Sequence, residues 1–130
     1  LSPWVDLAFE HGSDENIRYD YVTAGGEAWG PAYAGDVDLR HPLVSPLYAE
    51  LSGLPPLLLH AGGLEVLRGQ IEEFARRADL AGSPVTLEIS PRMVHVWHMF
   101  AAAFPEARDA IRSIADFVRM HIVTAATRAT

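Results

Sequence analysis

Cysteine is absent from the sequence, which excludes disulfides and thiolate metal sites. Long hydrophobic runs are absent as well, and none approaches the ~18 residues that a membrane-spanning helix requires. An excess of positive charge is also lacking: the formal net charge is −7, which disfavours nucleic acid as a partner. We therefore expect a chain without a membrane span, and the lack of cysteine is compatible with a cytoplasmic location.

What the sequence contains fits one globular domain. Its 130 residues are 49% hydrophobic and 21% charged, proportions typical of such domains. The first residues, LSPWVDL, include neither an initiator methionine nor the basic segment of a signal peptide. Because they read like the inside of a strand, we expect the chain to be part of a longer polypeptide.

Strand and helix patterns alternate in the second half of the chain. The apolar run within 55–63, bounded by Pro and Gly pairs, predicts a strand buried on both faces, as in a parallel sheet. Apolar residues at helical spacing predict a helix over 68–82, and alternation over 84–90 predicts a strand with one wetter face, typical of an edge. Pro105 begins another helical pattern that continues to Ile122. Strands that alternate with helices indicate an α/β architecture.

The first half of the chain contains weaker signals. A serine followed by acidic residues predicts a helix over 14–24. A short helical turn is expected over 27–33, and one further turn within 45–51. The segment 1–12 is typical of a strand end followed by a loop. Counting this first strand, we expect three strands at most.

Two ionisable side chains follow the two predicted strands directly. Glu65 comes after the run LLLH and the turn 61–63, and His95 comes after VTLEIS and its turn. Because functional groups of open α/β sheets gather at the carboxyl ends of the strands, we expect both side chains at one edge. A carboxylate that accepts a hydrogen bond from one imidazole nitrogen leaves the other nitrogen to take a proton from a nucleophile. The spacing therefore indicates an acid–base pair.

Several ordered blocks of the sequence resemble one enzyme family. The blocks SPWVDL, HPLVSPLYAELSGLPPLLLHAGGLEVL and VTLEISPRMVHVWHMFAAAFPEA are similar to the carboxyl-terminal part of the hormone-sensitive-lipase-like esterases, which are α/β-hydrolases. The resemblance extends from Ser2 to about Val118. It implies a carboxylic ester hydrolase without a cofactor, in which Glu65 is the catalytic acid and His95 is the catalytic histidine.

The resemblance also implies how the chain is arranged. Residues 1–130 would form a partial α/β-hydrolase domain, with the last parallel strands, their flanking helices and a cap-region insertion over 13–40. The cap would cover the acyl pocket for a small ester substrate. The candidate substrate-binding residues are Val96, Trp97 and Trp29. The last strand, 84–89, commonly forms a dimer edge in this family, which implies a homo-oligomer.

One part of the family pattern is missing from the sequence. α/β-Hydrolases carry their nucleophile in G-x-S-x-G, followed along the chain by the acid and then the histidine. Neither this motif nor an H-G-G-G oxyanion loop occurs here. The expected partner is therefore the amino-terminal half of the hydrolase or a second copy of the chain, and the chain alone should be inactive. Gly69 and Gln70 stand where the family has an Asp pair that caps the following helix.

Other chemistry is possible for the two site residues. His95 and His98 are spaced like a metal-binding pair, but zinc needs three or four ligands and no third candidate is suitably spaced, so we predict no metal site. His98 is interpreted as a residue at a helix start. Glu65 by itself could be a first-turn carboxylate near a helix dipole.

Structural roles are the alternative for the remaining candidates and for the chain as a whole. Trp29 and Tyr33 could pack inside the cap rather than contact substrate, and His60 is interpreted as a core residue. The alternative function is a non-catalytic association module. Such a module would expose a strand edge at its amino terminus, and exposed edges recruit partners.

Overall fold

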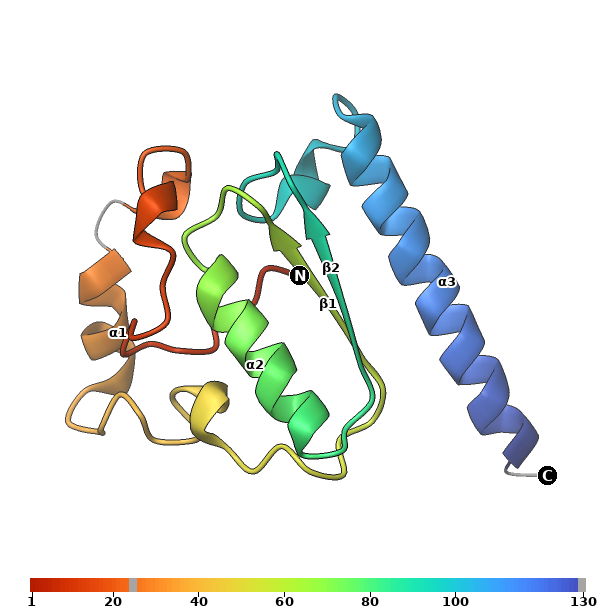
Figure 1. Ribbon diagram of the computed structural model, residues 1–130, viewed down its shortest axis with the longest axis horizontal. Coiled ribbons are helices and arrows are strands. Elements are labelled where there is room, and N and C mark those ends of the chain that lie inside the picture. Colours follow the sequence, from red (N-terminus) through yellow and green to blue (C-terminus); the bar gives the residue numbers. More distant parts are fainter. Residues whose placement is uncertain (24–25, 129–130) are drawn as a thin grey trace. The chain divides into compact units, whose positions relative to one another are not determined.

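The computed structural model describes residues 1–23 and 26–128 (Figure 1). The chain divides into two compact units, Leu1–Val96 and Trp97–Thr130. The first unit contains the sheet, and both Glu65 and His95 belong to it. The second unit contains one 3-10 turn and one long helix.

The first unit is built on a two-stranded parallel sheet. β1 (Leu57–Gly62) pairs with β2 (Val85–Ser90), in a register that runs from Leu57 opposite Val85 to Gly62 opposite Ser90. Both strands lie where the sequence predicts them. β1 is the more buried strand and β2 is partly exposed, as the continuous apolar run and the alternating pattern predict. The α/β architecture is therefore confirmed.

α2 (Arg68–Leu80) connects the strands and contacts both of them (Figure 1). Its buried apolar residues recur at helical spacing, and they are Ile71, Phe74, Ala75 and Ala78. They share one core cluster with Leu59 and Ala61 of β1. Full burial of a large aliphatic side chain stabilises the fold by about 1.5–3 kcal/mol. The helix stops before Gly82, whose φ of +83° suits a terminating glycine.

The amino-terminal end of α2 is held by other segments, because the helix has no side-chain cap of its own. The N–H of Gly69 donates to Oγ of Ser13 at 3.0 Å. Gln70 is fully buried, and its Oε1 accepts hydrogen bonds from the N–H groups of Val5 and Asp6 at 2.7 and 2.8 Å. The two residues that depart from the family pattern thus anchor α2 to the amino-terminal segment.

The single helix predicted over 14–24 is wrong for the residues that are described. Two 3-10 turns form instead, η1 (Asp14–Asn16) and η2 (Tyr21–Thr23), and Ala24 lies outside the described residues. Ser13, the predicted capping serine, makes no cap bond at η1, because its hydroxyl accepts the hydrogen bond from Gly69 of α2. Asn and Asp side chains can hydrogen-bond to backbone groups and so compete with helix formation. Here Asn16 and Asp20 bond to the backbone of residues 63–66, which are distant in the sequence.

The other short elements of the first unit follow the predictions, apart from the first strand. α1 (Gly26–Ala34) covers the predicted turn, and η3 (Pro46–Tyr48) lies within 45–51. The described amino terminus forms no strand: the N–H of Ser2 donates to the carbonyl oxygen of His60 at 2.8 Å, and Pro3 then has no N–H to continue the pairing. The expected strand end at the amino terminus is therefore wrong, and the two strands of the sheet lie within the predicted limit of three.

The second unit contains η4 (Trp97–Phe100) and α3 (Pro105–Arg128). α3 begins at the predicted Pro105, where a missing N–H costs nothing because the first N–H groups of a helix have no partner. It continues to Arg128, which is farther than the apolar pattern predicts. Within the described residues, no helix combines the length and the hydropathy that crossing a bilayer requires.

Candidate active site

Two loops meet at the carboxyl ends of the parallel strands. The loop after β1, residues 63–66, is called the acid loop, and the loop after β2, residues 91–96, is called the histidine loop. The N–H of Leu64 donates to the carbonyl oxygen of Met93 at 3.0 Å, which joins the two loops directly. The sequence predicts this proximity from the positions of the strand ends.

Glycine is required where the two loops touch. A Cβ at Gly62 would lie 2.4 Å from the carbonyl oxygen of Met93, and a Cβ at Gly63 would lie 2.3 Å from that of Pro91. Real Cβ atoms do not approach backbone this closely, so a side chain at either position would push the loops apart. The glycine pair after LLLHA is thus a condition for the approach of the histidine loop.

Glu65 and His95 lie next to each other at this contact. Nδ1 of His95 is 3.8 Å from Oε2 of Glu65, whose side chain is fully buried. The distance is longer than a hydrogen bond, and Nδ1 of His95 and Oε1 of Glu65 are both buried without a hydrogen-bond partner. A closure of about 1 Å would give a normal N–H···O bond. Because catalytic hydrogen bonds often tighten when substrate binds, the geometry suits an orienting carboxylate and its imidazole.

Burial shifts the pKa values of both groups towards their neutral forms. Burial raises the pKa of Glu65 to about 7, although a hydrogen bond from Ser2 favours the ionised form. Burial lowers the pKa of His95, and the negative charge of Asp20 opposes this effect. A neutral imidazole is the form that accepts a proton as a general base. An imidazolium formed beside Glu65 would in turn favour the carboxylate.

Polar side chains of the η1–η2 segment hold the acid loop in place. Nδ2 of Asn16 donates to the carbonyl oxygens of Gly63 and Glu65 at 3.2 and 3.1 Å. Oδ2 of Asp20 accepts a hydrogen bond from the N–H of Val66 at 2.8 Å. Both side chains are buried. Sequence reasoning missed these contacts because it assigned the segment to a cap, and only the polar composition of the segment could have suggested them.

The histidine loop receives a contact from the same segment. The hydroxyl of Tyr21 donates to the carbonyl oxygen of His95 at 2.8 Å. The two rings also meet edge-on, with their centroids 5.9 Å apart. One short segment therefore touches both loops. The spacing of Tyr21 along the chain gives no signal of this contact.

Val96 and Trp97 follow the candidate histidine in the sequence. Val96 has a φ of +46°, which is rare for a β-branched residue, and its N–H donates to Oγ of Ser2 at 3.1 Å. Trp97 is buried and begins the second unit, where its ring centroid lies 4.0 Å from that of His98. The substrate-binding roles of Val96 and Trp97 stay predictions.

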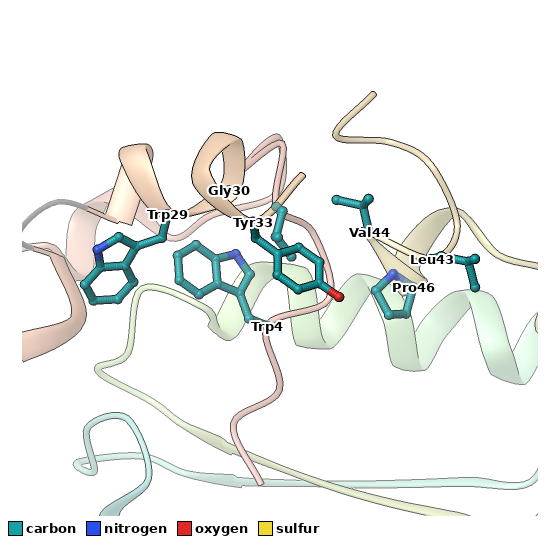
Figure 2. A pocket seen from close by; sticks show the side chains of 8 residues that line it. Trp4, Trp29, Gly30, Tyr33, Leu43, Val44 and Pro46 are labelled. Carbon is teal, nitrogen blue, oxygen red and sulfur yellow. The ribbon is translucent and has the colours of Figure 1, made fainter. Parts of the chain in front are cut away.

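Trp29 lines an apolar pocket of about 410 Å³, in which it lies beside Trp4 (Figure 2). The lining residues are Trp4, Leu7, Trp29, Gly30, Tyr33, Leu43, Val44 and Pro46. Trp29 is 51% exposed and Tyr33 is 71% exposed, so the expectation that they pack inside a cap core is wrong. Neither Glu65 nor His95 is among the lining residues. The pocket is therefore separate from the acid–base pair.

The remaining predicted histidines are buried. His60 is fully buried in β1, as predicted for a core residue, and its Nε2 lies 3.2 Å from Oε2 of Glu88, its register partner on β2. His98 is buried in η4. Within the part of the chain that the structure describes, no group of three or more His, Asp or Glu side chains is arranged to hold a metal ion.

Comparisons with known proteins relate the chain to hydrolases. Residues 1–99 match a family model described as the alpha/beta hydrolase fold. An acetyl-hydrolase of Streptomyces hygroscopicus is 40% identical over 122 residues, which are 92% of this chain and 41% of that relative. An esterase of Acinetobacter venetianus is 32% identical over 124 residues, with 90% and 40% covered. The chain thus spans about two fifths of the length of these relatives.

Solved structures of hormone-sensitive lipase homologues are also similar to the chain. The HSL homologue EstE7 from a metagenome library superposes with a TM-score of 0.88 at 36% identity, over 94% of this chain and 43% of that one. A hormone-sensitive lipase from a metagenome library gives a TM-score of 0.87 at 36% identity, with 92% and 42% covered. The predicted relation to part of an α/β-hydrolase is confirmed. The chain belongs to the α/β-hydrolase fold family, and it is similar to part of the hormone-sensitive lipase homologues.

Proposed function

We propose that this chain supplies the acid and the base of a Ser-Glu-His triad that hydrolyses carboxylic esters. Glu65 orients the imidazole of His95, and the nucleophilic serine and the oxyanion loop come from polypeptide outside these 130 residues. The observation that carries the proposal is the distance of 3.8 Å between Nδ1 of His95 and Oε2 of Glu65, on loops that follow adjacent parallel strands. The names of the relatives, acetyl-hydrolase and esterase, support the same chemistry.

In the proposed reaction His95 moves a proton in each half of the cycle. Because Nδ1 is directed to Glu65, Nε2 takes the proton of the serine hydroxyl as its oxygen attacks the ester carbonyl carbon. The tetrahedral intermediate then collapses, the bond to the alcohol oxygen breaks, and Nε2 gives the proton to the departing alcohol. Water attacks the acyl-serine with Nε2 as base, which releases the carboxylic acid and restores the serine. Glu65 stabilises the imidazolium in both halves without taking the proton.

The proposed substrate is an ester with a short acyl chain. One relative is named as an acetyl-hydrolase, and crystals of another, EstE5, were soaked with p-nitrophenyl butyrate. The proposed substrate contacts are Val96 and Trp97, which directly follow His95, and Trp29, which lines the separate apolar pocket. Triad hydrolysis of this kind uses no cofactor.

The proposal is tested by completing the triad. The part of EstE7 that this chain does not cover is fused to the chain, and initial rates of p-nitrophenyl butyrate hydrolysis are measured. We expect turnover by the fusion, negligible turnover by the 130-residue chain alone, and a loss on the order of 10⁴-fold or more for His95→Ala in the fusion. His41→Ala, in an exposed loop, is the matched control and should keep the rate. A His95→Ala rate equal to the control rate contradicts the proposal.

We also propose that the outer edge of β2 associates with another strand, either from the rest of the hydrolase or from a second copy. Among the described residues, β2 has β1 as its strand neighbour on one side, and none of its residues is fully buried. A strand at the edge of a sheet readily pairs with another strand. Light scattering of the isolated chain should therefore report a dimer. A monomer at high concentration contradicts the self-association.

A further inference from the structure

Ser2 connects the acid to the histidine loop through its hydroxyl group. Oγ of Ser2 donates a hydrogen bond to Oε2 of Glu65 at 2.7 Å and accepts one from the N–H of Val96 at 3.1 Å. Ser2 is only 3% exposed, so water competes little for these bonds. The hydroxyl thus stands between the carboxylate and the residue directly after His95.

The chemistry of the three groups fixes the direction of the hydroxyl proton. The N–H of Val96 can only donate, so it occupies a lone pair of Oγ. An ionised carboxylate can only accept, so the proton of Ser2 points to Glu65. A protonated Glu65 would bring a second proton into this contact. The bridge therefore favours the carboxylate, which is the form that a triad acid needs.

Two of the three residues in this bridge have a left-handed backbone, a conformation that Phe9 also adopts. Ser2 has a φ of +42° and Val96 a φ of +46°. The left-handed region costs free energy for residues other than glycine, and it persists where surrounding contacts hold it, commonly at functional sites. At Ser2 the bond from its N–H to the carbonyl oxygen of His60, at 2.8 Å, holds the backbone independently of the hydroxyl. The hydroxyl is thus available for a separate role.

We propose that Ser2 is a positioning residue for the Glu65–His95 pair: its hydroxyl holds Oε2 of the acid against the backbone of the histidine loop. Because this bond restrains the carboxylate, closure onto Nδ1 of His95 needs only a movement of the imidazole. The use of this contact in ester hydrolysis rests on the proposed function, whereas the contact itself does not.

The hydrogen bond from Ser2 opposes the effect of burial on Glu65. Burial raises the pKa of Glu65, while the Ser2 hydroxyl lowers it. Removal of the hydroxyl should therefore raise the pKa of Glu65 further. A purely structural role of Ser2 leads to a different result: the chain would lose stability while the titration of Glu65 stayed where it is.

The test is a ¹³C NMR titration of the Glu65 carboxyl group in the 130-residue chain. Ser2→Ala should raise the midpoint by about one pH unit, because the carboxylate loses its hydroxyl donor. Ser13→Ala is the matched control, because Ser13 is a buried serine whose hydroxyl bonds to Gly69. Its midpoint should equal that of the unmodified chain. An unchanged midpoint in Ser2→Ala overturns the proposal.

A second measurement uses the unmodified chain, so it tests the role of Ser2 even if Ser2→Ala does not fold. The amide chemical shift of Val96 should change with the same midpoint as the Glu65 carboxyl group, since the hydroxyl links the two. A Val96 amide shift that stays constant through that midpoint overturns the proposal. Neither measurement uses ester turnover, so the two proposals can fail separately. An inactive fusion in which the Val96 amide and the Glu65 carboxyl group share one midpoint would contradict the proposed function alone. An active fusion in which they do not share a midpoint would contradict the role of Ser2 alone.

Discussion

Nδ1 of His95 lies 3.8 Å from Oε2 of Glu65, although the whole of α2 separates the two residues in the sequence. The proximity arises because parallel strands joined by a helix bring successive carboxyl ends to one edge of a sheet. Both groups are buried enough for their pKa values to move towards the neutral forms. Their titration is therefore sensitive to the residues that surround them.

Glu65→Gln should change how stability depends on pH. Burial raises the pKa of Glu65 from 4.5 to about 7, so the folded chain keeps a proton that the unfolded chain releases. The stabilisation from this proton is fully present below the pKa that Glu65 has in the unfolded chain. It is lost as pH rises through the pKa that Glu65 has in the folded chain, which lowers the free energy of unfolding by on the order of 3 kcal/mol. Glutamine mimics the protonated form. Urea denaturation should therefore find Glu65→Gln more stable than the unmodified chain at pH 8 but not at pH 4, and equal stability at pH 8 would count against the assignment.

The pKa of the His95 imidazole should lie below that of an ordinary histidine, because burial lowers it. Asp20→Asn should lower that pKa further, since the negative charge of Asp20 raises it. A histidine whose pKa is lowered by folding stabilises the folded chain at pH values above its pKa in the unfolded chain. This stabilisation is lost as pH falls through its pKa in the folded chain. NMR titration of the imidazole measures the shift, with Asp14→Asn at an exposed position of the same segment as control. A higher pKa of His95 in Asp20→Asn would refute this electrostatic interpretation.

Gly63→Ala should separate the two loops, because its Cβ would lie 2.3 Å from the carbonyl oxygen of Pro91. We expect a loss of stability of about 1–3 kcal/mol, as for other overpacked sites. The hydrogen bond from the N–H of Leu64 to Met93 should weaken at the same time. Hydrogen exchange of the Leu64 amide measures this directly. Exchange as slow as in the unmodified chain would show that the loops tolerate the side chain.

Asn16→Ala should destabilise the acid loop, because it leaves the carbonyl oxygens of Gly63 and Glu65 without their side-chain donor. Loss of a partner from a buried polar group costs about 1–3 kcal/mol. Glu15→Ala, at an exposed position of the same turn, should change stability by less than about 0.5 kcal/mol. Chemical denaturation compares the two variants. Similar midpoints for both would mean that Asn16 does not support the loop.

Local periodicity was enough to predict the elements that carry the candidate site. The apolar run of β1, the helical spacing of α2 and the alternation of β2 each reflect burial of one or two faces, which a single sequence records. Because Glu65 and His95 directly follow strand ends, their proximity follows from the topology. The distance between them depends in addition on the glycine pair at 62–63, whose role appears only when the loops are seen in contact.

The supporting contacts could not be predicted in the same way. Asn16, Asp20 and Tyr21 act on loops far away in the sequence, and no spacing rule links such positions. These tertiary bonds also explain why the polar segment 14–23 forms two short turns instead of a helix. The cap-region insertion over 13–40, the homo-oligomer and the cytoplasmic location stay predictions.

The central claim, that Glu65 is the acid of an ester-hydrolysing triad, is tested most directly by kcat/KM for p-nitrophenyl butyrate in the fusion that completes the chain. Glu65→Gln keeps the size of the side chain but removes its charge, so the imidazolium of His95 loses its counter-charge. We predict a loss on the order of 10⁴-fold for Glu65→Gln. Glu50→Gln, in an exposed loop, should leave the value unchanged. A Glu65→Gln fusion as active as the Glu50→Gln fusion would contradict the claim.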